Sequence, residues 1–225
     1  MKEKNEKKID SAELANSIRE VNHPCIMAQA IMKRSKATIN NYGDFRDVDQ
    51  AALVLLDLAE FINRYDFSGL DLSTFIAVFD DADDLSEEEF EKALWNLLQH
   101  ISDLDDTPWA STISSDPSDL SFAFCIRGHA FYIRGMHANS SRKSRRTTAP
   151  TIIFSPKTQF EQVKELGMYR NIKELIRSRE MEYQGSINPM LSLFEATSEA
   201  REYSGRSVDD DWVCPFKLKP KKDTQ

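Results

Sequence analysis

Hydrophobic positions in the first half of the chain recur mainly with the helical period. Between residues 47 and 64, apolar side chains stand three or four positions apart, a spacing that places them on one face of an α-helix. The stretch Ser86-Glu-Glu-Glu89 has the form of a capping box, in which a serine hydroxyl and a glutamate carboxylate satisfy free backbone N–H groups. It predicts a second helix that runs to about Ile101.

The segments around these two helices are shorter. Ser11 can cap a helix through Ile18, and the His23-Pro24 step ends it, because the residue before a proline avoids the α region. Residues 25–32 predict a buried segment, helix or strand. Residues 40–44 are typical of a turn, and residues 75–79 predict a buried strand.

The second half changes to the pattern of a sheet. Residues 122–127 and 129–134 are rich in β-formers and are separated by a break at Gly128, which predicts paired strands. A third strand is expected at residues 151–154, and helices at 158–166, 169–183 and 192–201. We therefore predict an α+β fold, mostly helical, with a small antiparallel sheet in the C-terminal half. One domain is expected over residues 10–216, with a disordered tail at 1–9 and a basic tail at 217–225.

Composition narrows the possible classes of protein. The 225 residues are 40% hydrophobic and carry a formal charge of −8, which disfavours nucleic acid as a partner. No apolar run approaches the ~20 residues that span a bilayer, and no signal peptide is visible. The three cysteines are far apart and fit neither a disulfide framework nor a zinc motif. A cytoplasmic protein with reduced thiols is expected, without nucleic acid or membrane partners. Its oligomeric state is open, a homodimer included.

One loop combines an imidazole with clustered cations. His137 follows Gly135 at the end of an expected strand, and hydroxyls and arginines come next. A neutral imidazole is a standard iron ligand, and arginine forks suit carboxylates. Haem offers iron and two propionates, so one loop can hold both ends; the alternative interpretation is a solvated basic loop. The candidate residues of this loop are His137, Ser140, Ser141, Arg142, Arg145 and Arg146.

Two cysteines and two residues near the C-terminus complete the candidates. Cys25 and Cys214 each lie beside a proline, and a cysteine thiolate can also ligate haem iron. The alternative is that each is a small buried hydrophobe. Glu199 offers a carboxylate for a guanidinium ion, with Tyr203 beside it. Turn chemistry and salt bridges within a helix are the alternative there.

The ordered set of motifs resembles the YqcI/YcgG family. The likeness covers essentially the whole second half and only Pro24-Cys25 clearly in the first. The matching segments are Cys25 after a proline, Pro108-Trp109, Phe122-x-Phe124, Gly135-Met-His137-x-x-Ser140-Ser-Arg142-x-x-Arg145-Arg146, Phe154-x-Pro156-x-x-Gln159-Phe160-Glu161, Ile176-Arg177-x-Arg179, Gly185-Ser-Ile-Asn188-Pro189-Met190, Ser198-Glu199-Ala-Arg-Glu202-Tyr203-Ser-Gly205 and Trp212-x-Cys214-Pro215-Phe216.

The chain departs from the family pattern at three positions. It has His23 where phenylalanine is more common, Ala138 where proline is more common, and Glu202 where glutamine is more common. The first change adds a titratable group near the site. The third leaves the substrate open.

The resemblance implies an enzyme. Characterised members of this family are haem-dependent N-hydroxylases that act on guanidino groups of free arginine or arginine-derived amino acids. It therefore implies haem b, O₂ as co-substrate, a guanidine or amine substrate, and an electron-donor reductase or reductant. We expect His137 as the proximal iron ligand, with Cys25 or Cys214 as alternatives.

The other candidate residues then take roles around the haem and the substrate. Arg142, Arg145 and Arg146 would neutralise propionates, with Ser140 and Ser141 as hydrogen-bond donors. Glu199 would anchor the guanidinium, with Tyr203 lining the pocket. Two alternatives remain: a non-catalytic haem carrier or sensor, and an anion- or nucleotide-binding module that uses the Arg142–Arg146 loop.

Overall fold

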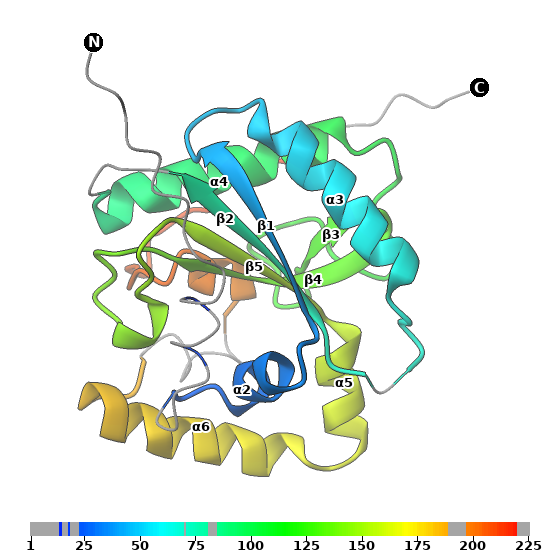
Figure 1. Ribbon diagram of the computed structural model, residues 1–225. Helices are drawn as coiled ribbons and strands as arrows, with labels where there is room; N and C mark the ends of the chain where they lie inside the picture. The colour runs from blue at the N-terminus through cyan, green and yellow to red at the C-terminus, as the bar shows by residue number, and fades with distance from the viewer. Residues whose placement is uncertain are drawn as a thin grey trace.

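A five-stranded sheet forms the middle of the molecule. The computed structural model describes Leu14, Ile18 and residues 23–69, 71–80, 85–188 and 197–219. The strands are β1 (Ala37–Asp44), β2 (Thr74–Asp80), β3 (Phe124–Ile126), β4 (His129–Met136) and β5 (Thr151–Pro156), in the order β1-β2-β5-β4-β3. The helices lie on both faces of this sheet (Figure 1).

The α+β class is confirmed, and the three strands of the second half are antiparallel as predicted. The sheet also takes in β2, antiparallel to β5, and β1, parallel to β2, so it is mixed. The turn predicted at residues 40–44 is wrong, because these residues lie in β1. There Asn40 Nδ2 and the Tyr42 hydroxyl both donate to Asp57 Oδ2 at 2.7 Å, which satisfies polar groups that otherwise favour a turn.

One face of the sheet carries the main core. The helices α3 (Gln50–Arg64) and α4 (Glu87–Leu104) pack on it, and the predicted capping box is present, with Glu89 N donating to Ser86 Oγ at 3.2 Å and Ser86 N to Glu89 Oε2 at 2.9 Å. Aromatic side chains fill this layer, and the largest fully buried ones include Phe45, Phe75, Phe79, Phe90, Phe122, Phe124, Phe131, Phe154, Tyr203 and Phe216. Burial of this much apolar area is the dominant favourable contribution to folding.

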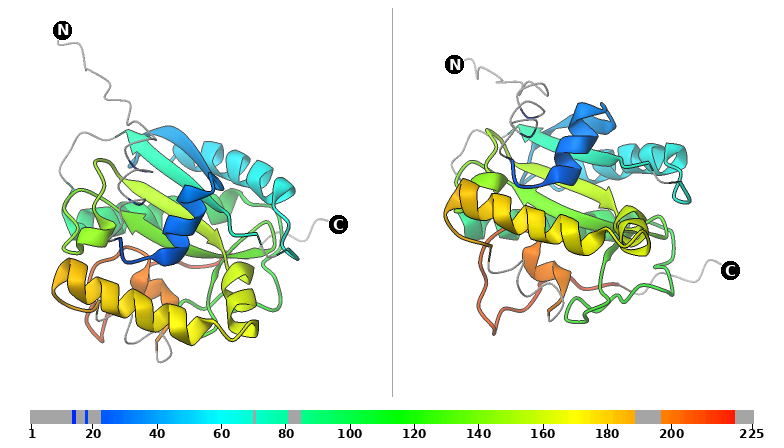
Figure 2. Two further views of the ribbon diagram at one scale, coloured as in Figure 1. Left: turned by 60° about the horizontal axis from the view of Figure 1, so that its bottom comes forward. Right: turned by 90° about the horizontal axis from the view of Figure 1, so that it is seen from below.

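The other face is covered more thinly by α2 (Ile26–Lys33), α5 (Thr158–Glu165) and α6 (Tyr169–Gln184). Figure 2 shows the long α6 crossing this side, with the shorter α2 beside it over the sheet. The apolar cluster here is small, with Ile76 and Val78 of β2 and Met32 of α2 among its members. The predicted segment at residues 25–32 is thus a helix, α2.

Two short 3₁₀ turns complete the described structure. Lys143–Arg145 forms η1 in the β4–β5 loop, and Glu199–Glu202 forms η2. Tyr203, directly after η2, contacts β4 beyond the short stretch that pairs with β3, and there Gly135 N donates to Tyr203 O at 2.7 Å. The helix predicted at 192–201 is therefore a 3₁₀ turn at its described end. Its residues 192–196 lie outside the described residues, as do the tail at 1–9, most of the helix predicted from Ser11, and residues 220–225.

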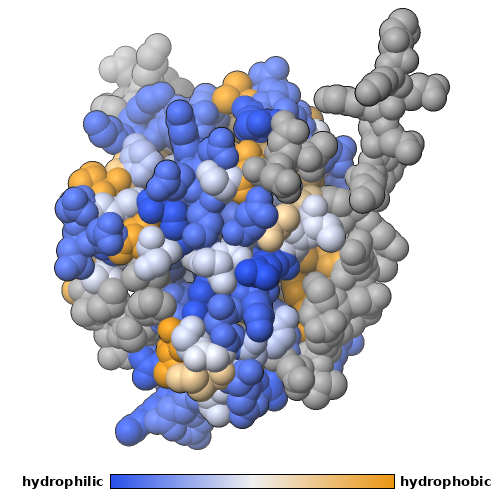
Figure 3. Space-filling view, turned by 90° about the vertical axis from the view of Figure 1, so that its left-hand side faces the viewer, coloured by the Kyte–Doolittle hydropathy of each residue, from blue (hydrophilic) through white to orange (hydrophobic). Residues whose placement is uncertain are grey.

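The side of the molecule drawn in Figure 3 is mainly hydrophilic, with hydrophobic residues in small separate patches. Among the described residues, no helix is both long and apolar enough to span a bilayer.

Candidate functional site

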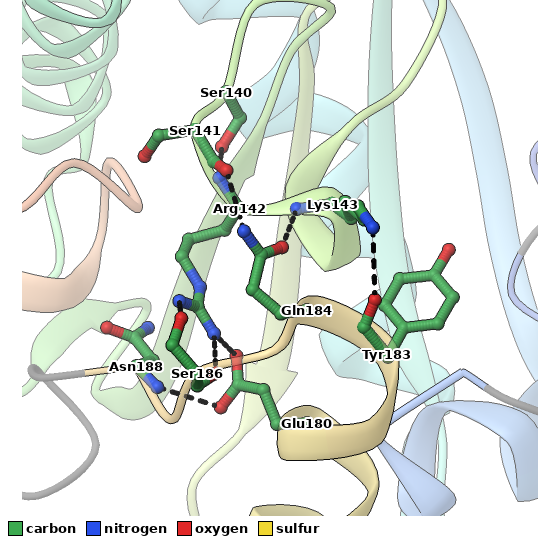
Figure 4. A network of polar contacts seen from close by, with 9 residues as sticks. All are labelled: Ser140, Ser141, Arg142, Lys143, Glu180, Tyr183, Gln184, Ser186 and Asn188. Carbon is green, nitrogen blue, oxygen red and sulfur yellow. Dashed lines mark hydrogen bonds and ion pairs between the residues drawn. The ribbon is translucent and has the colours of Figure 1, made fainter.

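The β4–β5 loop, which holds most of the predicted site residues, is tied to the end of α6 (Figure 4). Arg142 donates to Glu180 Oε1 at 2.7 Å and to the hydroxyl and carbonyl oxygens of Ser186 at 2.9 and 2.8 Å. The second carboxylate oxygen of Glu180 accepts from Asn188 N at 3.2 Å. Lys143 N donates to Gln184 Oε1 at 2.7 Å. The guanidinium of Arg142 is therefore already bonded within the protein.

The other two arginines of this loop also bind protein oxygens. Arg145 donates to Gly135 O at 2.9 Å and Glu202 O at 3.2 Å, and burial lowers its pKa to about 10. Arg146 Nε donates to Ser140 O at 2.7 Å. Ser141 donates through its backbone and hydroxyl to Glu87 Oε1 at 2.9 and 2.8 Å. The predicted binding of propionates by this loop stays a prediction, and it would require these bonds to be exchanged.

His137 lies on the α4 side of the sheet. It is 2% exposed and stacks on Phe90 of α4, with ring centroids 4.3 Å apart. Burial lowers its pKa, which favours the neutral imidazole, and its Nδ1 has no hydrogen-bond partner. Gly135 makes room for the Phe90 ring, because a Cβ at that position would lie 2.5 Å from Phe90 Cε1.

Glu199 and Tyr203 are brought together by η2. Tyr203 donates its hydroxyl to Glu199 Oε1 at 2.9 Å, and Lys157 Nζ donates to Glu199 Oε2 at 3.1 Å. Burial raises the pKa of Glu199 and the charge of Lys157 opposes that shift. Both carboxylate oxygens thus have internal partners. The role of Glu199 as a guanidinium anchor stays a prediction.

A cavity of about 160 Å³ lies between α2, the sheet and α6. Its lining is mainly apolar, from residues of α2, β2, β5 and α6. The polar lining residues include His23, Cys25, Arg134, Arg145, Ser155, Gln159 and Glu180. Arg134 and Met136 of β4 line this cavity, whereas Phe131 and Ile133 of the same strand face the main core.

Cys25 and His23 stand together on the wall of the cavity. Cys25 caps α2, and its Sγ accepts from Ala28 N at 3.4 Å. Cys25 N in turn donates to His23 Nδ1 at 3.2 Å. Burial lowers the pKa of His23, which favours its neutral form. A thiol and an imidazole thus share one end of the α2 segment.

Cys214 lies elsewhere, in a separate pocket with Trp212, Val213 and Phe216. Burial raises the pKa of its thiol to about 12, which keeps it protonated at neutral pH. The structure therefore separates the two cysteines that the sequence offered as equivalent alternatives.

Comparison with known proteins shows which family the chain belongs to. A model of the YqcI/YcgG family matches residues 14–217. The chain belongs to the YqcI/YcgG family. A relative named "Uncharacterized protein YqcI", from Bacillus subtilis (strain 168), is 26% identical over 207 residues, which cover 86% of this chain and 80% of that protein. No solved structure matches.

In this YqcI/YcgG protein, only some of the predicted site residues line the cavity. Cys25 and Arg145 line it, whereas His137, Cys214, Glu199 and Tyr203 do not. Arg134, which the sequence reasoning missed, is a charged residue inside an otherwise apolar strand, and that irregularity was the available signal. Nowhere in the described ranges do three or more histidine, cysteine or acidic side chains gather as in a metal site.

Proposed function

We propose that this protein binds haem b in the cavity beside α2 and hydroxylates a guanidino nitrogen of free arginine or an arginine-derived amino acid. The observation that carries the proposal is the presence of Cys25 and His23 together on the wall of an apolar cavity. A cysteine thiolate and a histidine imidazole are both established ligands of haem iron. Membership of the YqcI/YcgG family supports the same chemistry.

The residues that line the cavity suit haem chemically, but the volume of the cavity is small. Met27, Ile31 and Ile153 offer the apolar wall that a macrocycle needs, and Arg134 offers a cation for a propionate. The cavity of about 160 Å³ is smaller than the ~300–1,000 Å³ of typical ligand pockets. Loading would therefore move α2 away from the sheet.

The chain's own part in the reaction is to bind, orient and exclude water. Haem, when bound, would supply activated oxygen from O₂ with two electrons from an external donor. The thiol of Cys25 is fixed by its bond with Ala28 N, so a ligand from this position would be held in place by α2. The apolar wall would keep bulk water from the reacting centre.

The test is the absorption spectrum of the purified protein titrated with haemin, in the ferric, ferrous and ferrous-CO forms. We expect one haem per chain, and a CO-bound band typical of thiolate that Cys25→Ser abolishes and the matched variant Cys214→Ser retains. A CO-bound spectrum typical of imidazole that His137→Ala abolishes would identify His137 as the iron ligand, as expected from the sequence. The same spectrum abolished by His23→Ala would identify His23 as the ligand. Absence of specific uptake would refute the proposal. Turnover of arginine with a reductant then separates an oxygenase from a haem carrier or sensor.

A further inference from the structure

Arg134 brings a positive charge to the wall of the cavity. It stands between Ile133 and Gly135 in β4 as a partly buried residue, and its guanidinium carbon lies 4.7 Å from the centre of the Tyr132 ring. No described residue accepts a hydrogen bond from it. A charge removed from water needs an anionic partner or acceptors, because desolvation otherwise costs more than the fold recovers.

Burial lowers the pKa of Arg134, but neighbouring groups, chiefly Tyr132 and Glu202, raise it more, although neither of these two accepts a hydrogen bond from its guanidinium. Glu202 accepts from the Tyr132 hydroxyl at 3.3 Å, and burial raises the pKa of its carboxyl to about 7, so it is only partly ionised at neutral pH. Arg145 lines the same cavity, and the charge of Arg134 helps to lower its pKa. Among the residues that line the cavity, Arg134 and Arg145 are cationic, and the acidic Glu180 is already paired with Arg142.

Gln159 supplies a second, independent sign of a missing acceptor. The residue is 1% exposed and lines the cavity from α5. Its Oε1 accepts from Ser73 N at 3.3 Å, which fixes the orientation of the amide. Its Nε2 has no hydrogen-bond partner. Buried donors are nearly always satisfied, so this amide is available to donate to an acceptor on a ligand in the cavity.

We propose that Arg134 and Gln159 form the carboxylate subsite of this cavity. The ligand class is a carboxylate attached to an apolar body, because the rest of the wall is mainly aliphatic, with Met27, Ile31 and Ile76 among its residues. The inference shares its cavity with the proposed function but holds without haem. The same chemistry has two sources, a haem propionate and a small organic acid.

The test compares matched ligands by isothermal titration. The first pair is phenylacetate and its neutral amide, titrated into haem-free protein. The second pair is haemin and haemin dimethyl ester, whose propionates are blocked. The variants are Arg134→Met, which keeps length without charge, Arg134→Lys, which keeps the charge, and Gln159→Glu, which keeps the acceptor for Ser73 N and removes the free donor. The control is Arg170→Met, an exposed cation on α6.

Arg134→Met and Gln159→Glu should each weaken carboxylate binding about tenfold or more, since bonds to a charged group are the strong ones. Binding of the neutral partner should not change, Arg134→Lys should restore part of the affinity, and Arg170→Met should behave as wild type. Circular dichroism confirms that each variant is folded.

The two ligand pairs distinguish the two sources of the carboxylate. If the variants weaken the binding of haemin alone, the subsite binds a haem propionate. If they weaken the binding of phenylacetate alone, it binds a small organic acid. Phenylacetate binding without any haemin uptake keeps the subsite and rejects the haem proposal. Equal affinities of the variants and wild type in both arms, or no binding of either carboxylate, overturn the subsite.

Discussion

At the scale of single residues, the two buried carboxylates beside β4 differ in their neighbours. Glu199 contacts Lys157 and Tyr203, whereas Glu202 contacts the Tyr132 hydroxyl. Burial raises the pKa of both, and that of Glu202 reaches about 7. The native state therefore holds a proton on Glu202 more tightly than the unfolded chain does.

This difference predicts a pH dependence of stability. Between about pH 4.5 and 7 the native state binds more protons at Glu202, so its contribution to the free energy of unfolding falls as pH rises, by up to about 3 kcal/mol. Glu202→Gln removes this contribution, and its advantage over wild type should grow from pH 4.5 to 8. Urea denaturation at several pH values measures it. The exposed control Glu165→Gln should track wild type, and a constant difference for Glu202→Gln would contradict the assignment.

At the scale of elements, the β4–β5 loop and the C-terminal end of α6 form one unit. Arg142 joins them through Glu180 and Ser186, and the side chains of the ion pair are only 10% and 4% exposed. A buried pair of this kind is costly to break from one side, because the remaining carboxylate stays buried without its cation.

We expect Arg142→Ala to lower the free energy of unfolding by about 3–5 kcal/mol. The matched control is Arg170→Ala on α6, whose ion pair with Glu174 is exposed and should contribute about 0.3–0.5 kcal/mol. Thermal or urea unfolding of both variants provides the comparison. Equal losses in the two would show that the loop is not held through Arg142.

Local signals predicted some elements well and others poorly. The capping box at Ser86 and Glu89 acts within one turn, so sequence alone located the start of α4. The strand β1 was not predicted, because its polar residues are typical of a turn and they form a strand only by pairing with β2. The same holds for the cavity. The proline beside Cys25 marked that residue in the sequence, but Arg134 and Gln159 are brought to the same cavity only by the fold, because they are distant from α2 in sequence.

At the scale of the whole molecule, the two helical layers are unequal. The α3–α4 layer is filled with aromatic side chains, whereas the layer of α2, α5 and α6 keeps a cavity. The short helix α2 is held across this layer in part by Arg179, which donates to Gln29 Oε1 at 2.9 Å. Regions with few packed contacts open at low free energy.

Filling the cavity should therefore stabilise α2 most. We expect hydrogen–deuterium exchange of residues 26–33 to slow when haemin or phenylacetate binds, while exchange in α3 stays unchanged. Mass spectrometry of peptides from both helices provides the readout. Slowing that is equal in the two helices, or absent from α2, would place the ligand elsewhere.

The central position of β2 also constrains how the chain folds during synthesis. β2 is almost wholly buried, yet its antiparallel partner β5 is made only after α4, β3 and β4. Until β5 leaves the ribosome, an apolar strand from the first half presents an unpaired edge, the kind of surface that promotes aggregation. The sheet can close only late in translation, so the two halves of the chain depend on each other for folding.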